Sequence, residues 1–279
     1  MSVLLNLATA IWKHTPSRAL REKYFAVFCW FVRGRRRMVT IDGVALHLDL
    51  SETIDVATLL RRFEPEIVEA IKHHARPGDV VIDIGANTGI HALAFAATVF
   101  PGGKVYAFEP TNDAFARLRE HIGLNPKFDV EAIQLALSDQ NLPAQEVDFR
   151  SSWRTDGVVE KRLSTVAFER FDDWIRDRKI DRIDIVKLDV DGHEYPVLHG
   201  ASETLGRLLP TIFMEVGLYH FEDAARDPVA LLAQMGYRFW DAKSKQPYSR
   251  DTMKTRLSQA AMKGITINVI ASAAEGFVP

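Results

Sequence analysis

Short apolar runs alternate with helical stretches through most of the chain, and this alternation restricts the fold more than any other feature of the sequence. The first run, Val80–Ile84, is nearly continuous and ends at Gly85, as expected of a parallel strand buried on both faces. A helical stretch follows at residues 89–99, and the next apolar run begins at Lys104. Repeated strand–helix–strand units of this kind form a mostly parallel sheet with helices on both faces.

The rest of the chain extends this pattern to a complete domain. Six later strands of the sheet are expected at residues 104–108, 130–135, 183–188, 211–216, 237–240 and 265–271, and two extra strands outside the alternation at residues 145–149 and 164–168. Helices are expected at residues 3–13, 18–33, 65–74, 113–121, 171–178, 194–208 and 228–235. Asp42-Gly43 is typical of a hairpin turn. We therefore expect an α/β fold with a mostly parallel seven-stranded sheet at 61–279, preceded by a helical and hairpin extension at 1–60.

Composition excludes several classes of protein. The chain is 47% hydrophobic and 26% charged, which is ordinary for a globular protein and excludes a wholly disordered one. The single cysteine, Cys29, cannot form an internal disulfide or a cysteine-based zinc site, and it fits a reducing compartment. No apolar run approaches the roughly 18–20 residues that a transmembrane helix needs. We expect a cytoplasmic protein.

Basic residues are concentrated at the start of the chain. Residues 1–40 carry eight bases and one acid, interleaved with Trp12, Phe25, Phe28, Trp30 and Phe31. A basic amphipathic helix of this kind can lie on an anionic membrane surface. The alternative, which we favour, is a helical cap on the enzyme or an oligomer contact. Nucleic acid is not an expected partner, because the remainder of the chain is acidic and carries no motif for binding DNA or RNA.

The loop after the first core strand predicts a nucleotide-type cofactor. Gly85 and Gly89 permit a tight turn, and the following helix presents free N–H groups. Glu109 comes 24 residues after Gly85, about where a carboxylate grips a ribose diol. Asn87 and Ile90 occupy two positions where a dinucleotide fingerprint has glycine. S-adenosylmethionine therefore fits better than NAD, although a nicotinamide-dependent oxidoreductase is the alternative enzyme.

Titratable residues follow two later strands, whose carboxyl ends are expected at the same edge of the sheet. They are Asp189, Asp191, His193, Glu194, Glu215 and His220. If the cofactor donates its methyl group to an alcohol, the transfer is an in-line displacement, and a base that takes the hydroxyl proton accelerates it. We expect His193 to be this base, with Asp189 orienting it or taking the proton itself, and Glu215 nearby. Alternatively, Asp189, Asp191 and Glu215 hold Mg²⁺, which acidifies the hydroxyl.

Four motifs in this order resemble those of the FkbM-type S-adenosylmethionine-dependent methyltransferases. They are the segments at residues 83–89 (DIGANTG), 108–110 (FEP), 136–139 (ALSD) and 187–194 (KLDVDGHE). The resemblance covers roughly residues 60–240 and implies a class I methyltransferase fold and O-methylation of sugar or polyketide hydroxyls. Asp191 stands where the family's motif usually has Glu. Together, the loop and the resemblance imply that the cofactor contacts Asp83, Gly85, Ala86, Asn87, Thr88, Gly89, Glu109, Pro110, Leu137 and Ser138.

By this resemblance Gly85, Asn87 and Gly89 line the methionine end of the cofactor, and Leu137 with Ser138 borders the adenine. We therefore expect an O-methyltransferase acting on a sugar, a glycan or a glycosylated small metabolite. The alternative that is not an enzyme is a catalytically silent cofactor-binding module within an assembly.

Three further residues are expected to have structural and not catalytic roles. Lys187 is expected to pair with a nearby carboxylate, Glu194 to cap a helix, and His220 to lie on the surface. The polar loop at residues 151–160 interrupts the alternation of strands and helices. We expect it either to help hold the substrate as a lid, with Trp153 as a stacking platform, or to be an ordinary surface loop.

Overall fold

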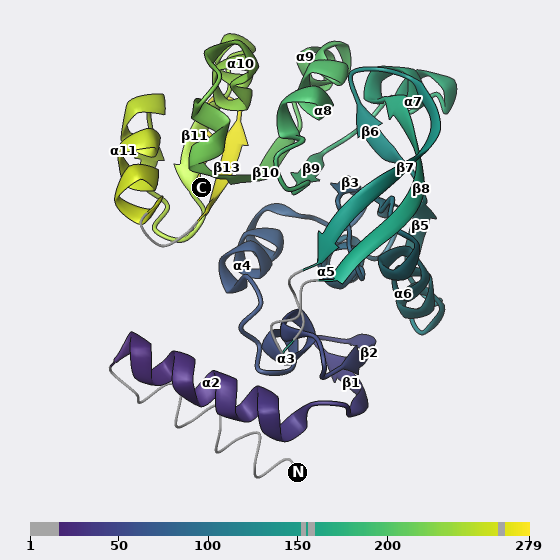
Figure 1. The fold of residues 1–279 in the computed structure, drawn as a ribbon. Coiled ribbons are helices and arrows are strands. Elements are labelled where there is room, and N and C mark those ends of the chain that lie inside the picture. Colours follow the sequence, from purple (N-terminus) through teal and green to yellow (C-terminus); the bar gives the residue numbers. More distant parts are fainter. Residues whose placement is uncertain (1–16, 152–154, 156–159, 262–265) are drawn as a thin grey trace. The chain divides into compact units, whose positions relative to one another are not determined.

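The computed structural model describes residues 17–151, 155, 160–261 and 266–279, which belong to two compact units (Figure 1). The first unit takes in the chain up to Pro65 together with Asp148–Leu163, and the second comprises Glu66–Val147 and Ser164–Pro279. The helix expected at residues 3–13 and the stacking platform expected at Trp153 lie outside the described residues. The domain boundary expected between residues 60 and 61 stays a prediction.

The first unit contains the expected hairpin between two helices. Its elements are α2 (Arg18–Val32), β1 (Arg36–Ile41), β2 (Val44–Asp49) and α3 (Thr53–Leu59). Asp42 and Gly43 have φ values of 51° and 82°, which is the left-handed conformation that a two-residue hairpin turn requires at both positions. Every second residue of β2 is buried, as in a strand with one face on a core. The helix α3 was not predicted, since it has only seven residues.

The second unit is built on an eight-stranded sheet in the order β12-β11-β13-β10-β9-β3-β4-β5 (Figure 1). The strands are β3 (Val80–Ile84), β4 (Lys104–Phe108), β5 (Asp129–Ile133), β9 (Ile185–Leu188), β10 (Thr211–Val216), β11 (Arg238–Asp241), β12 (Pro247–Tyr248) and β13 (Ile267–Ser272). The five strands β10, β9, β3, β4 and β5 pair in parallel, and β13 runs antiparallel to β10 and β11. The expected α/β fold with a mostly parallel sheet is confirmed. The sheet has one strand more than predicted, because β12 is a two-residue edge strand too short to give a pattern.

Helices cover both faces of this sheet. They are α4 (Pro65–His74), α5 (Ile90–Val99), α6 (Asn112–Gly123), α7 (Phe171–Asp177), α8 (Glu194–Gly200), α9 (Ser202–Leu208), α10 (Pro228–Gln234) and α11 (Arg250–Ala261). The alternation of side chains along β10 shows the two layers. Ile212 and Met214 join the core cluster that contains Trp174 of α7, whereas the Phe213 ring stacks on Phe95 of α5 with centroids 5.9 Å apart.

The single helix expected at residues 194–208 is wrong, because the structure divides it into α8 and α9. The backbone of Gly200 passes so close to the Ser138 carbonyl that a Cβ atom would lie 1.9 Å from that oxygen. The chain leaves the helical course at the next residue, Ala201, whose φ and ψ are −101° and 2°. The helix α11 was not expected either, since most of its residues are polar and, among residues 250–259, only Met253 and Leu257 are fully buried.

A second sheet of three strands carries the residues expected near the adenine. Its order is β6 (Ala136–Ser138), β8 (Glu160–Arg170) and β7 (Leu142–Ser151). The two strands expected at residues 145–149 and 164–168 are confirmed as parts of the longer β7 and β8. Strand β6 pairs in parallel with β8, with Leu137 opposite Glu169, and both Leu137 and Ser138 are buried.

Candidate functional site

The register of the main sheet brings the predicted site residues to one edge. Ile84 at the end of β3 lies opposite Phe108 of β4 and Leu188 of β9, and Leu188 lies opposite Met214 of β10. The residues that follow these positions therefore meet at the carboxyl ends of four adjacent strands. They are Gly85, Glu109, Asp189 and Glu215. Ligands of open parallel sheets bind at this edge, so the expected convergence is observed.

The loop after β3 is held by its neighbours in a shape that requires glycine. Gly85 and Gly89 have φ values of 81° and 87°, and Asn87 has a φ of 50°. A Cβ atom on Gly85 would lie 1.9 Å from the carbonyl oxygen of Asp189, so the loops after β3 and β9 touch through their backbones. The amides of Gly85 and Ala86 both donate to the Phe108 carbonyl, at 3.0 and 2.8 Å. Backbone contacts thus fix this loop on two sides.

Helix α6 fixes the other end of the same loop. A Cβ atom on Gly89 would lie 2.5 Å from a methyl carbon of Leu118, so this glycine allows the two helices to pack closely. His121 is fully buried, and its Nδ1 atom lies 2.7 Å from the Thr88 carbonyl oxygen. Sequence reasoning did not identify His121 as a residue of this site. Its spacing of three residues from Leu118, on one face of a helix, is the signal that could have found it.

Glu109 is buried and already serves as an anchor for the cofactor loop. Its Oε2 atom accepts a hydrogen bond from the Asn87 amide at 2.9 Å, and Oε1 accepts from the amide and hydroxyl of Thr111 at 2.8 and 2.5 Å. Burial raises the pKa of Glu109, and these hydrogen bonds oppose the rise. A carboxylate can accept about four hydrogen bonds. One acceptor position on Oε2 therefore stays available for a ligand hydroxyl.

Asp83 differs from Glu109 in that its carboxylate is closed to solvent. Neither of its oxygens accepts a hydrogen bond within the described residues, and its pKa is raised by burial. The Nζ atom of Lys187 lies 3.7 Å from Asp83 Oδ1 and 3.2 Å from Asp189 Oδ2. Lys187 is therefore an ion-pair partner, as predicted. It links the buried carboxylate of Asp83 within β3 to the first carboxylate after β9.

Three carboxylates form an acidic cluster, which we define as Asp189, Asp191 and Glu215. Their ligand atoms all lie within 4.8 Å of one another. The pKa of Asp191 is raised, first by loss of hydration around its carboxylate and then by the charges of Asp189 and Glu194. Glu215 accepts a hydrogen bond from the Thr266 hydroxyl. Such a donor set suits Mg²⁺ chemically, although the Lys187 ammonium competes for Asp189.

His193 lies on a different side of this loop from the one expected. Its Nε2 atom is 3.1 Å from the Ser138 hydroxyl, and its ring packs edge-on against Phe168. Burial lowers the pKa of His193, so the imidazole is neutral near pH 7. The structure thus pairs His193 with a residue expected at the adenine, not with Asp189.

His220 is buried, and the expectation that it lies on the surface is wrong. Its Nε2 atom is 2.7 Å from Glu194 Oε2, and the Gly217 amide donates to its Nδ1 atom at 3.0 Å. Nδ1 is therefore unprotonated, and the Nε2 proton points at the carboxylate. The other carboxylate oxygen of Glu194 accepts from the Val190 amide at 3.1 Å. Glu194 is the first residue of α8 but does not act as its N-cap, which is His193, and its carboxylate instead joins the loops after β9 and β10.

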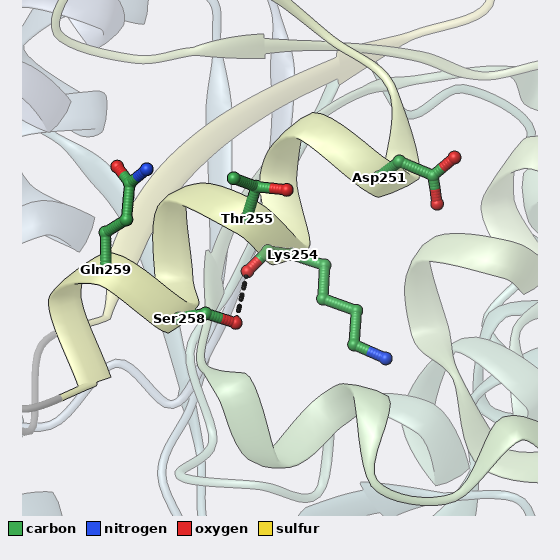
Figure 2. Close-up of a pocket in the computed structure, with 5 residues that line it drawn as sticks. All are labelled: Asp251, Lys254, Thr255, Ser258 and Gln259. Atoms are coloured by element: carbon green, nitrogen blue, oxygen red, sulfur yellow. Dashed lines mark hydrogen bonds between the residues drawn. The ribbon is translucent and has the colours of Figure 1, made fainter.

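Two measurable cavities lie away from this edge of the sheet. One of about 510 Å³ is lined by exposed polar side chains of α11, and Figure 2 shows the Ser258 hydroxyl donating to the Lys254 carbonyl there. The other, of about 490 Å³, lies beside α7 and α9 and includes Asp172 and Arg207. Neither is lined by a residue predicted for the cofactor or the acidic cluster. We assign the candidate site to the sheet edge, because the predicted cofactor loop, Glu109 and the acidic cluster meet there.

Comparison with known proteins finds similarity over the same region. A family model described as the methyltransferase FkbM domain matches residues 83–239. The chain is 29% identical over 195 residues to the 2-O-methyltransferase NoeI of Sinorhizobium fredii, covering 61% of this chain and 76% of that one. It is 28% identical over 148 residues to the hexuronic acid methyltransferase AglP of Haloferax volcanii, covering 52% and 59%. A solved structure of methyltransferase FkbM from Methylobacillus flagellatus matches with a TM-score of 0.45 and 15% identity, covering 78% and 53%.

Proposed function

The chain belongs to the methyltransferase FkbM family, and from this premise we propose that it methylates a hydroxyl of a sugar, a glycan or a glycosylated small metabolite. S-adenosylmethionine is the methyl donor of an O-methyltransferase of this kind. The observation that carries the proposal is the meeting of the Gly85–Gly89 loop, Glu109 and the acidic cluster at one edge of the sheet. A donor and an acceptor bound at this edge would lie side by side.

The residues around the loop fit the chemical parts of the donor. The free acceptor position on Glu109 suits a ribose hydroxyl, and the next residue, Pro110, would contact the cofactor beside it. The loop residues Gly85, Ala86, Asn87, Thr88 and Gly89 would hold the methionine end. Leu137 and Ser138 would border the adenine. Asp83 contributes by fixing Lys187 and not by an open carboxylate.

The reaction requires a group that takes the proton of the acceptor hydroxyl. When bound, S-adenosylmethionine supplies a methyl group activated by its sulfonium. Asp189 lies in the acidic cluster and would receive the proton as the acceptor oxygen bonds to the methyl carbon. Glu215 and Asp191 would hold other hydroxyls of the acceptor. His193, the base expected from the sequence, becomes the second candidate because its neutral ring is bonded to Ser138.

Asp189, Asp191 and Glu215 are also the residues that would hold Mg²⁺, which would make the hydroxyl more acidic. Metal and base chemistry are separated by adding EDTA to the assay. Full activity in EDTA supports proton transfer to a carboxylate, whereas loss of activity that returns with Mg²⁺ supports the metal.

A sugar acceptor is supported by one relative, whose name gives hexuronic acid as its substrate, and O-methylation by another, which is named as a 2-O-methyltransferase. The decisive experiment mixes the protein with S-adenosylmethionine and neutral or acidic glycosides, followed by mass spectrometry. A gain of one methyl group on a glycoside supports the proposal. Calorimetry adds a test of the cofactor: tight binding of NAD and none of S-adenosylmethionine would favour an oxidoreductase instead.

Helix α2 presents an apolar stripe that the chemistry of the site does not explain. Leu20, Tyr24, Val27 and Phe31 recur at helical spacing and are 43–64% exposed, and Trp30 is 76% exposed. The exposed residues Arg33, Arg35 and Arg36 follow the helix. Of the helices in the described ranges, none is long and apolar enough to cross a membrane.

In place of the cap or oligomer contact favoured from the sequence, we propose that this stripe lies on an anionic membrane surface, because its apolar side chains are exposed and basic side chains follow them, as the interface of such a bilayer requires. Sedimentation with phosphatidylglycerol vesicles, and not with phosphatidylcholine vesicles, is the expected result. Trp30→Ala should weaken this binding. A dimer in solution without vesicle binding would assign the stripe to a second copy instead and overturn the proposal.

A further inference from the structure

Tyr219 is an exposed aromatic residue beside the candidate site. It belongs to the 3₁₀-helix η1 (Leu218–Phe221), which follows β10, and it is 42% exposed. Its ring lies beside the buried His220 ring, with centroids 4.3 Å apart. Within the described part of the chain its hydroxyl has no hydrogen-bond partner. The phenol is thus placed by packing, and its polar end is available to a ligand.

Two glycines from two different loops pack against the edges of this ring. A Cβ atom on Gly217 would lie 2.1 Å from a ring carbon of Tyr219, and one on Gly192 would lie 3.6 Å from the opposite edge. The φ of Gly217 is −109°, which any residue can adopt. The backbone therefore does not require glycine at position 217, and the obstacle to a side chain there is the Tyr219 ring.

These two glycines place the phenol next to the acidic cluster. Gly192 directly follows Asp191, and Gly217 comes two residues after Glu215. Burial, and then the charges of Glu194 and the acidic cluster, raise the pKa of Tyr219. The hydroxyl therefore keeps its proton at neutral pH and can donate a hydrogen bond.

We propose that Tyr219 is the platform on which the acceptor sugar ring lies, and that it positions the reacting hydroxyl against the acidic cluster. This inference rests on the proposed function and names the part of the site that reads the acceptor. The aromatic face offers contact to the C–H groups of a sugar ring, and the carboxylates offer acceptors to its hydroxyls. Because three carboxylates repel another anion, the platform favours neutral sugars over uronic acids.

The test measures acceptor kinetics with S-adenosylmethionine and four methyl glycosides, those of glucose, mannose, galactose and glucuronic acid. Tyr219→Ala should raise the acceptor KM about tenfold, with a smaller effect on kcat and no change in donor Kd by calorimetry. Tyr219→Phe, which keeps the ring, should raise KM less. Tyr106→Phe removes a phenol from β4, away from this edge, and should leave both constants unchanged.

A second variant tests whether the absence of a side chain at Gly217 determines where the Tyr219 ring lies. Gly217→Ala should displace the ring and raise KM as Tyr219→Ala does, while the double variant should be no worse than Tyr219→Ala alone. An unchanged acceptor KM in Tyr219→Ala, with a glycoside that the wild type methylates, overturns this inference and leaves the proposed function standing. If the wild type binds S-adenosylmethionine and methylates none of the four glycosides, both the platform and the sugar acceptor are overturned.

Discussion

The Nε2 atom of His220 lies 2.7 Å from the Oε2 atom of Glu194, and both side chains are buried. Glu194 begins the helix after β9, whereas His220 lies in η1 after β10. Each partner accepts a second hydrogen bond. The Val190 amide donates to Glu194, and the Gly217 amide donates to His220. This pair therefore fixes the relative positions of the two loops that carry the acidic cluster and Tyr219.

Removing His220 should destabilise the fold and weaken catalysis. His220→Ala leaves a buried carboxylate without its partner, which should lower the free energy of unfolding by roughly 1.5–3 kcal/mol. Urea denaturation measures this loss. The matched variant His199→Ala removes an imidazole whose side chain is 55% exposed, and it should change stability by less than about 0.5 kcal/mol. Equal losses in the two variants would show that the pair does not hold the loops.

Adding a methyl group at Gly85 should lower the stability of the fold far more than adding one at Gly78. Both glycines have φ values above 80°, so an alanine at either position costs about 1–2 kcal/mol of backbone strain. A Cβ atom on Gly85 also meets the Asp189 carbonyl at 1.9 Å, while one on Gly78 meets no atom within 4 Å. Gly85→Ala should therefore lose at least about 1–3 kcal/mol more stability in urea, and it should bind S-adenosylmethionine poorly. Similar midpoints for the two variants would contradict the contact between the loops.

The pattern of the sequence was sufficient for the main sheet and its ligand-binding edge, because buried parallel strands produce continuous apolar runs. It did not predict β6 or α3, since elements of three and seven residues carry too little periodicity. The sequence pattern also grouped the site residues by their closeness in sequence, which does not match their contacts in the structure. His193 and Asp189 are close in sequence but have different partners, and His220 reaches Glu194 across 26 residues. Such pairings depend on tertiary packing, which no local spacing records.

Replacing Glu109 should separate its two roles. Glu109→Gln retains one oxygen acceptor for the loop amides but loses the charge that would strengthen a hydrogen bond to a ribose hydroxyl. We expect the Kd for S-adenosylmethionine to rise about tenfold, with little change in thermal stability. Calorimetry measures the Kd, and Glu69→Gln on the exposed face of α4 is the matched control. An unchanged Kd would show that the ribose lies elsewhere.

Stability should fall below neutral pH because of His74. Burial and then the charges of His73, Lys245 and Arg76 lower the pKa of His74 from 6.5 to about 4. Between these two values the unfolded chain binds a proton that the folded chain does not, so the free energy of unfolding falls as the pH falls from 6.5 to about 4.

His74→Phe provides the measurement for this effect. The imidazole of His74 stacks on the Phe277 ring with centroids 4.9 Å apart, and a phenyl ring retains that contact without titrating. Urea denaturation at pH 7 and at pH 5 should therefore show a smaller loss of stability in the variant than in the wild type. Equal losses would mean that His74 takes up its proton as readily in the folded state as in the unfolded state, and that other groups produce the acid sensitivity.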